Sequence, residues 1–403
     1  MEHCAAGQER NGVPGSLLSL ELLFADEVCA GLLSDEKLLA AMARFEGALA
    51  RASAPAEQAE IISRVCERAQ FDATQLAREG RTGTLAIPFV KQLTAQVAAV
   101  SPEAARYVHA GATSQDVIDT AVVLCLKPAC ARVAELTTRV GDAAAGLAQR
   151  HARTPTVART LLQPALPVTF GWKAAVWLSM LARSLAGMRS AAAGACILQF
   201  GGPSGTLSSF GERGAAVMAA LAQELELPPS LVPWHSARDR FARLGAELAI
   251  LAGSAGKIGR DVSLLMQQEV AEAAEAAKAG RGGSSSMPHK RNPALSMLAL
   301  EAAQRAPGLA ATLLVQLTPE HERGLGQWQS QWFILRDLVC TAASGTAAMA
   351  EALADLEVDE PAMQANLASL LEDQPLDAFG SAGAMIERAL AEWSAATSRG
   401  TAP

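Results

Sequence analysis

Aromatic residues are scarce in this chain. They make up 4% of its 403 residues, and only one of them is a tyrosine. Half of the residues are hydrophobic, and alanine and leucine are prominent among them. Strands favour aromatic and β-branched side chains, whereas alanine and leucine favour helices. The composition therefore predicts an all-α protein, and the length allows two or three domains with a large core.

Clustered metal ligands are also missing. The seven cysteines are scattered without a Cys-x-x-Cys pair, and the six histidines include no His-x-x-x-His spacing. Proteins framed by disulfides or by structural zinc need such clusters. We therefore expect free thiols in a reducing cytosol, with no metal and no cofactor.

Two kinds of surface are absent as well. The chain has 34 basic and 41 acidic residues, so a broad basic face for nucleic acid is not expected. No uninterrupted apolar run reaches the ~18 residues that span a bilayer. The first 15 residues lack the apolar core of a secretory signal. We expect a cytoplasmic protein that binds neither nucleic acid nor membrane.

The apolar residues that are present follow helical spacing over long stretches. Between Asp239 and Gln268 they alternate steps of four and three, which is typical of a helix packed in a bundle. The run from Val133 to Leu147 has the same spacing, and residues 171–198 contain no proline. Helices this long and rich in alanine cannot bury both sides within one subunit, so we expect a homo-oligomer.

Changes in composition divide the chain into four parts. We expect a disordered N-terminus at 1–15, an N-terminal helical domain at 16–109, a central helical-bundle domain at 110–356 and a short C-terminal helical domain at 357–403. Within the second part, apolar residues recur at three- and four-residue steps over 34–52, which predicts an amphipathic helix.

The most distinctive segment is 278–293, where a Gly-Gly-Ser-Ser-Ser run precedes Met-Pro-His-Lys-Arg-Asn-Pro. It contains no acid, and its four cations are Lys278, Arg281, Lys290 and Arg291. Asn292 and Pro293 suit the N-cap and first position of a helix, whose free N–H groups would add positive potential. A Gly-Ser run alone is typical of a linker, but the cationic block is not. The segment predicts a site for a small anion, with hydroxyls beside it for proton transfer.

Two further segments carry polar residues in an ordered pattern. In His109–Thr120, Thr113 or Ser114 can cap a helix, and hydroxyls with free N–H groups at a helix start bind anions. A well-capped helix without a ligand would give the same pattern. The other segment, Thr154–Pro164, contributes Arg159, Thr160 and Gln163 as polar side chains.

In chain order, His109–Thr120, Thr154–Pro164 and 278–293 resemble the first, second and third signatures of the fumarase/aspartase superfamily, and the resemblance extends over about residues 20 to 370. It implies a three-domain all-α fold whose central long-helix bundle packs into a homotetramer. It also implies that each active site is built from three subunits of that tetramer.

The resemblance assigns roles to single residues. Ser284 matches the catalytic serine of the superfamily, and Lys290 matches the signature lysine. A serine hydroxyl is a poor acid near neutral pH, so Ser284 needs a positive field around it. The remaining positions are expected to bind a small polycarboxylate: Thr113, Ser114, Gln115, His109, Arg159, Thr160, Gln163, Ser285, Met287, His289, Asn292 and Arg323.

Two positions depart from the second signature. Ala158 replaces its usual glycine, and Leu161 stands where fumarases and adenylosuccinate lyases carry a histidine that serves the leaving group. An aliphatic side chain cannot transfer a proton. Three other strings, Ile87–Lys91, Leu198–Leu207 and Glu320–Arg323, resemble 3-carboxy-cis,cis-muconate cycloisomerases. The resemblance thus implies an intramolecular lyase that closes a lactone from a carboxymuconate.

Two alternatives stay open. An adenylosuccinate- or argininosuccinate-type lyase would release fumarate, and Leu161 argues against it. An inactive helical paralogue would account for the lost histidine and the short C-terminal part. The intact string from Ser284 to Pro293 argues against that second alternative.

Overall fold

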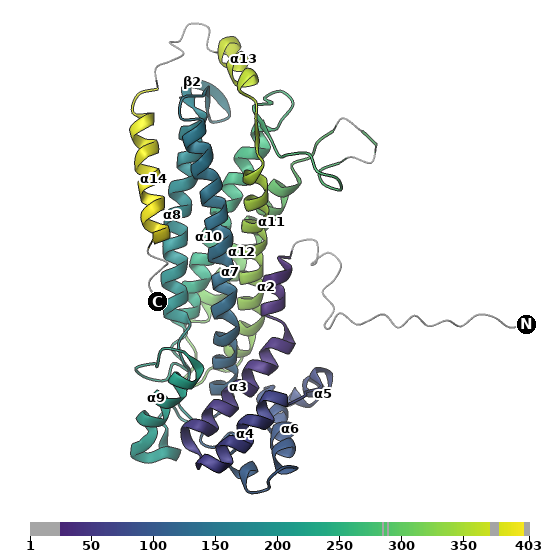
Figure 1. Ribbon diagram of the computed structural model, residues 1–403, viewed down its shortest axis with the longest axis vertical. Helices are drawn as coiled ribbons and strands as arrows, with labels where there is room; N and C mark the ends of the chain where they lie inside the picture. The colour runs from purple at the N-terminus through teal and green to yellow at the C-terminus, as the bar shows by residue number, and fades with distance from the viewer. Residues whose placement is uncertain (1–24, 284–285, 288–289, 371–378, 399–403) are drawn as a thin grey trace, which may run out of the picture.

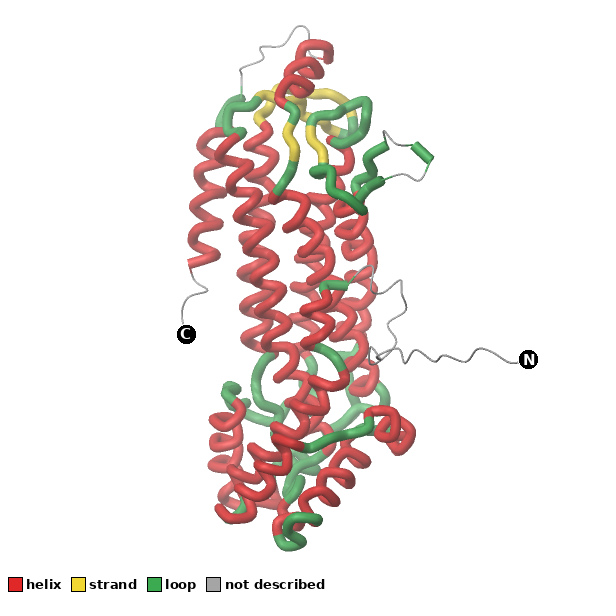
Figure 2. Tube along the Cα trace, turned by 45° about the vertical axis from the view of Figure 1, so that its right-hand side comes forward, coloured by secondary structure: helices red, strands yellow, loops and turns green. Residues whose placement is uncertain are grey.

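Long helices that run side by side make up most of the molecule (Figures 1 and 2). The structure, a computed structural model, describes residues 25–283, 286–287, 290–370 and 379–398. The long helices in these ranges are α7 (Ser114–Arg150), α8 (Phe170–Ala195), α10 (Asp239–Leu265), α11 (Ala294–Val315) and α12 (Gln327–Ala354). The prediction of an all-α protein with a central long-helix bundle is therefore confirmed. The expected disordered N-terminus lies outside the described residues.

The regular spacing predicted for α10 produces one continuous buried face. Leu244, Leu248, Leu251 and Ile258 are each 0% exposed, which confirms the interpretation of the spacing. This face packs mainly against α11 and α8. At Gly256 the two backbones approach closely, since a Cβ there would lie 2.3 Å from the Cβ of Ala303 on α11.

Helix α12 is, among the described residues, the one helix long and apolar enough to cross a membrane by length and composition. However, 67% of its apolar window is buried inside the protein. Its side chains pack against α11, α7 and α10. Burial in the bundle therefore accounts for the apolar composition of α12.

Shorter helices lie beside the bundle or toward one end of it (Figure 1). They are α2 (Glu27–Leu32), α3 (Asp35–Ser53), α4 (Ala56–Arg68), α5 (Ala73–Glu79), α6 (Ala86–Ala98) and α9 (Gly214–Leu225), with the 3-10 helices η1 (Gly80–Thr82), η2 (Ala104–Tyr107) and η3 (Ser208–Arg213). Helix α3 confirms the amphipathic helix expected at 34–52, because its Met42, Phe45 and Leu49 are 0% exposed.

The described C-terminal residues form two helices, α13 (Glu360–Leu370) and α14 (Ala382–Ser398). Helix α13 packs against β1, and α14 packs along α8. Trp393 of α14 also donates a hydrogen bond from Nε1 to Asp142 Oδ1 on α7, at 2.9 Å. Helix α14 therefore adds a further helix to the side of the bundle. The domain boundaries proposed above stay predictions.

Within the described ranges, two antiparallel strand pairs interrupt the helices. Strand β1 (Pro155–Thr160) pairs with β2 (Gln163–Thr169), and β3 (Ala273–Ala274) pairs with β4 (Glu357–Val358). Leu161 and Leu162 form the tip of the first hairpin with φ angles of 51° and 67°. The composition did not predict this hairpin, although Thr156, Val157 and Thr160 are residues that strands favour.

Helix α7 sets the distance between the first signature and the β1–β2 hairpin. Its 37 residues correspond to ~55 Å at ~1.5 Å per residue. The first signature lies where α7 begins, and the β1–β2 hairpin follows directly after α7 ends. Figure 1 shows the hairpin at the top of the view and α3, α4, α6 and α9 at the bottom.

Candidate active-site segments

The first signature is anchored by a buried carboxylate. Thr113 is the N-cap of α7, as predicted, and its N–H donates to Asp116 Oδ2 at 3.0 Å. Asp116 is 0% exposed and also accepts the N–H groups of Gly201 and Gly202, both at 2.9 Å. The ring Nε2 of His235 lies 2.8 Å from Asp116 Oδ1. One side chain therefore fixes the start of α7 against the 201–202 loop and His235.

Arg323, from the C-terminal half of the chain, also contacts Thr113 and the loop at 202–203. Its Nη1 donates to Thr113 Oγ1 at 2.7 Å, and its Nη2 donates to the carbonyls of Gly202 at 3.1 Å and Pro203 at 2.7 Å. The structure thus brings together two residues that the sequence assigned to one substrate site. In this arrangement the Arg323 guanidinium bonds to protein groups and holds the Thr113 hydroxyl in place.

Ser114 and Gln115 occupy the first two positions of α7. Gln115 is 2% exposed, and its Nε2 donates to the carbonyl of His235 at 2.8 Å and to Asp119 Oδ2 at 3.3 Å. Its side-chain amide is therefore directed into the protein. Backbone N–H groups at the first positions of a helix have no carbonyl partner within it, and such groups bind anions in other proteins.

A buried ion pair lies one turn further along α7. Asp119 is 1% exposed and accepts two hydrogen bonds from Arg238, at 2.6 and 3.1 Å. Trp328 Nε1 donates to Asp119 at 2.9 Å, and Arg238 Nε donates to Gln331 at 2.8 Å. The pair joins α7 to α12 and to the residue that precedes α10. The sequence assigned no role to Asp119, Arg238 or His235. Their partners lie more than 90 positions away along the chain, so no local pattern marks these contacts.

The second signature is held at the opposite end of α7. Arg159 forms two parallel hydrogen bonds to Glu272, at 2.9 and 2.7 Å, and Glu272 is 0% exposed. Thr156 and Asn366 donate to the same carboxylate at 3.0 and 2.9 Å. Burial lowers the pKa of the nearby Lys173, although the charge of Glu272 partly opposes this effect. The positive charge of Arg159 is thus matched by an acid of its own chain.

The tip of the hairpin points away from the protein. Thr160 and Gln163, which the sequence assigned to substrate binding, are exposed. Leu161 is 97% exposed and Leu162 is 74% exposed. The tip of the hairpin therefore presents two apolar side chains side by side to its surroundings.

Three of the expected residues in the third signature, Ser284, Ser285 and His289, lie outside the described residues. Met287 is 40% exposed. Asn292 closes the base of the segment, because its N–H donates to the carbonyl of Gly282 at 2.8 Å and its Nδ2 donates to the carbonyl of Gly283 at 3.3 Å. At Gly282 φ is 67°, and a Cβ there would lie 2.6 Å from the Asn292 carbonyl, so this position requires glycine.

The start of α11 differs from its prediction. Pro293 is the N-cap and the helix begins at Ala294, one residue later than expected. The N–H groups of Leu295 and Ser296 donate to Glu275 at 3.0 and 2.7 Å, and Glu275 is 3% exposed. The sequence prediction that free N–H groups here add positive potential is therefore corrected, because a buried carboxylate of the same chain binds them.

The cations of the segment are also largely matched by acids. Three of the four form ion pairs with residues of α12 or of the segment that follows it: Lys278–Asp355, Arg281–Glu351 and Arg291–Glu357. The expectation of an uncompensated positive cluster is thus corrected, since acids distant in sequence fold against it. Lys290 is exposed and forms no ion pair within the described part of the chain.

The second and third signatures lie at the same end of the molecule. Glu272 binds Arg159, and Glu275, three residues later, caps the start of α11. The first signature lies at the far end of α7, ~55 Å away by helix length. A single chain therefore brings two of the three signatures together and leaves the first one apart.

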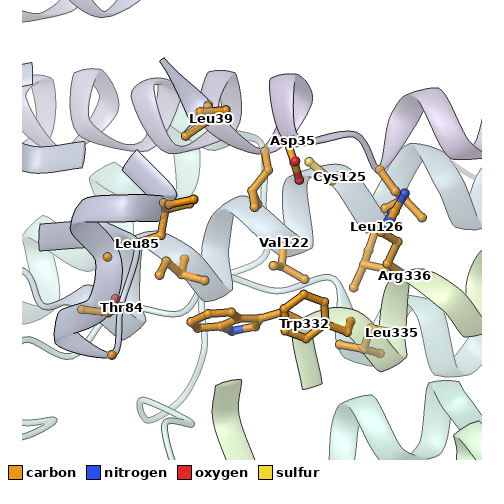
Figure 3. Close-up of a pocket in the computed structure, with 18 residues that line it drawn as sticks. Asp35, Leu39, Thr84, Leu85, Val122, Cys125, Leu126, Trp332, Leu335 and Arg336 are labelled. Carbon is orange, nitrogen blue, oxygen red and sulfur yellow. The ribbon is translucent and has the colours of Figure 1, made fainter. Parts of the chain in front are cut away.

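A cavity of about 510 Å³ lies between α3, α5, α7 and α12 (Figure 3). Its walls are mostly apolar and include Leu39, Val122, Leu126 and Trp332 (Figure 3). None of the predicted site residues that the structure describes lines it. Its lining does not match a polycarboxylate, which needs charged and hydrogen-bonding partners.

Residues 30–308 match a protein-family model described as lyase. The chain therefore belongs to this lyase family, which confirms the predicted fumarase/aspartase relationship. It is 48% identical over 339 residues to the 3-carboxy-cis,cis-muconate cycloisomerase of Bradyrhizobium diazoefficiens, an alignment that covers 83% of this chain and 75% of that protein. The cycloisomerase of the same name from Pseudomonas aeruginosa is 47% identical over 83% of this chain and 74% of the relative.

Solved structures also match the chain. The crystal structure of 3-carboxy-cis,cis-muconate lactonizing enzyme from Pseudomonas putida matches with a TM-score of 0.88 at 34% identity, covering 94% of this chain and 99% of that one. A class II fumarase from Schistosoma mansoni matches with a TM-score of 0.72 at 16% identity, covering 83% of this chain and 79% of that one. The second likeness concerns the fold alone.

Proposed function

We propose that this protein is an intramolecular lyase that closes 3-carboxy-cis,cis-muconate to 4-carboxymuconolactone, a step of protocatechuate breakdown through β-ketoadipate. The observation that carries the proposal is its 42–48% identity to three bacterial cycloisomerases, each over 83% of this chain. Leu161 supports it, because a carboxylate leaving group in the reverse reaction departs without a proton donor. We propose no metal and no cofactor.

In the proposed reaction, one carboxylate of the substrate adds to a carbon of its own double bond and forms the ring C–O bond. The π electrons move onto a second carboxylate as an enolate-like dianion, and a proton is then added to carbon. Ser284 would deliver this proton and remove it in reverse. Lys290, exposed and without an ion pair among the described residues, would stabilise the dianion. One well-placed donor of this kind contributes ~3–4 kcal/mol.

The start of α7 would hold another carboxylate of the substrate. The N–H groups of Ser114 and Gln115 and the fixed hydroxyl of Thr113 are the groups that support this role. His109, Arg159, Thr160, Gln163, Asn292 and the other expected binding residues remain part of the proposal. Arg159 and Arg323 would act mainly by holding the hairpin and Thr113, since their guanidinium groups bind protein atoms.

We also propose that the protein is a homotetramer with shared sites. The length of α7, which keeps Thr113 far from the other two signatures, supports this proposal. The exposed leucines at the hairpin tip support it as well. A cytoplasmic location is consistent with the six described cysteines, all of which are free thiols.

The direct test is to add purified protein to 3-carboxy-cis,cis-muconate and follow the loss of diene absorbance. We expect loss with the natural protein and none with Ser284→Ala. No loss with the natural protein would rule out the assignment. Release of fumarate from adenylosuccinate or argininosuccinate would instead identify the lyase alternative.

The shared site has its own test. Ser284→Ala and Thr113→Val should each be inactive, whereas hybrid tetramers formed by mixing and refolding them should recover activity. Native mass spectrometry would verify that hybrids have formed. Hybrids that form but stay inactive would contradict a site shared between subunits.

A further inference from the structure

A buried glutamate lies behind the first signature. Glu46 is on α3, where its side chain is 0% exposed. Both of its oxygens contact one residue: Oε2 accepts the N–H of His109 at 3.0 Å, and Oε1 lies 2.6 Å from His109 Nδ1. A buried carboxylate is costly unless its hydrogen bonds are satisfied. Here His109 alone supplies both partners.

This contact defines which ring nitrogen of His109 is available. An ionised carboxylate only accepts hydrogen bonds, so with Glu46 ionised Nδ1 carries the proton that the two groups share. Nε2 forms no hydrogen bond within the described part of the chain, and the side chain is 17% exposed. The backbone of His109 has φ of 56°, a conformation that non-glycine residues adopt only when their surroundings hold them.

The charges near the ring favour its protonated form. Burial disfavours the charged ring, but the charge of Glu46, its hydrogen bond to the ring and the charge of Asp116 outweigh that effect and raise the pKa of His109. Glu46 acts from α3 and Asp116 from α7. Protonation would make Nε2 a charged donor located four residues before Thr113, at the anion-binding start of α7.

We propose that Glu46 is a positioning residue of the active site, which orients His109 through Nδ1 and the backbone so that Nε2 donates to a substrate carboxylate. The inference rests on the proposed function, because it concerns the same site. Glu46 itself does not touch substrate and acts through His109. Such a supporting carboxylate fixes the tautomer and orientation of a histidine.

Kinetics of Glu46→Gln test the proposal. We expect KM to rise about tenfold near neutral pH, with kcat changed less than about twofold, because a charge-assisted contact to bound substrate is weakened. The alkaline rise in KM should begin at lower pH than in the natural protein. The control is Ser63→Ala, which removes another buried polar contact to α3, the bond from Ser63 Oγ to the Gly47 carbonyl at 3.3 Å. This control should leave KM unchanged.

A double-mutant comparison separates positioning from general support of the fold. In a His109→Asn background, Glu46→Gln should change KM less than about twofold, since the residue through which it acts is gone. An undiminished effect in that background, or an unchanged KM for Glu46→Gln alone, would overturn the proposal.

A third measurement needs neither a Glu46 variant nor turnover. Histidine labelled with ¹⁵N in the natural protein should show His109 protonated at Nδ1, and His109→Asn identifies its signal. Adding propane-1,2,3-tricarboxylate should shift the Nε2 signal more than the Nδ1 signal. A His109 that is unprotonated at Nδ1, or that does not respond to the tricarboxylate, contradicts the inference. If this response occurs while carboxymuconate is not turned over, the proposed reaction is wrong and the positioning role stands.

Discussion

At the start of α7, the first signature is held by a closed network, whereas the hairpin and the 278–293 segment at the other end place residues outward. Asp116 and Asp119 are each bonded to several partners of the same chain and are nearly inaccessible. At the far end, Leu161 and Lys290 are exposed. The comparison shows one end whose polar groups are closed off by contacts within the chain and another end whose side chains are exposed, as the proposed sharing of sites between subunits requires.

Removing Asp116 should produce the largest effect. Asp116→Ala leaves three N–H groups and His235 without their buried acceptor, so we expect a loss of ~3–5 kcal/mol in the free energy of unfolding. Urea denaturation measures it. Asp72→Ala, at the exposed N-cap of α5, is the control and should cost ~1 kcal/mol. Equal stability of the two variants would show that the network at α7 is not the stronger anchor.

Removing Arg159 should have a smaller and more local effect. In Arg159→Met, Glu272 keeps the hydrogen bonds from Thr156 and Asn366, so we expect a loss of ~2–3 kcal/mol. Hydrogen exchange should increase in the β1–β2 hairpin and stay unchanged at the start of α7. Faster exchange at both ends would contradict the idea that they are held independently.

Changing Leu161 should affect assembly more than folding. Because Leu161 is 97% exposed, Leu161→Ser should change the stability of a subunit by less than ~0.5 kcal/mol. Sedimentation velocity should show weaker association. Leu231→Ser alters a residue that is 100% exposed elsewhere in the chain and should leave association unchanged. If both variants associated equally strongly, the hairpin tip would not be part of a subunit interface.

The smallest expected effect is a pH dependence at the α7 end. The folded pKa of His109 is raised, because Glu46 and Asp116 outweigh the effect of burial. The stabilisation by its charge is thus fully present below the ordinary pKa of ~6.5 and is lost as pH rises through the folded value. The stability difference between the natural protein and His109→Asn should therefore be smaller at pH 9 than at pH 6. A difference independent of pH would contradict the assignment of charge to His109.

Much of the fold could be predicted from local patterns. The spacing of apolar residues in α10, the capping role of Thr113 and the amphipathic helix α3 were all confirmed. The hairpin after α7 was missed, because apolar and polar residues do not alternate clearly around Pro155. The supporting acids Glu46, Glu272 and Glu275 were missed as well. Nothing near them in sequence marks them as buried, since their partners come from other elements.

Sequence alone determined the helical periods, the identity of the signature segments and the replacement of a proton-donating histidine by Leu161. Each of these features involves residues that are close together along the chain, so residue spacing and side-chain chemistry are enough to recognise it. Only the tertiary structure decided which charges remain available to a ligand. Ion pairing depends on distance in space, and the acids that neutralise Arg281, Arg291 and Arg159 lie 66 to 113 positions from them along the chain.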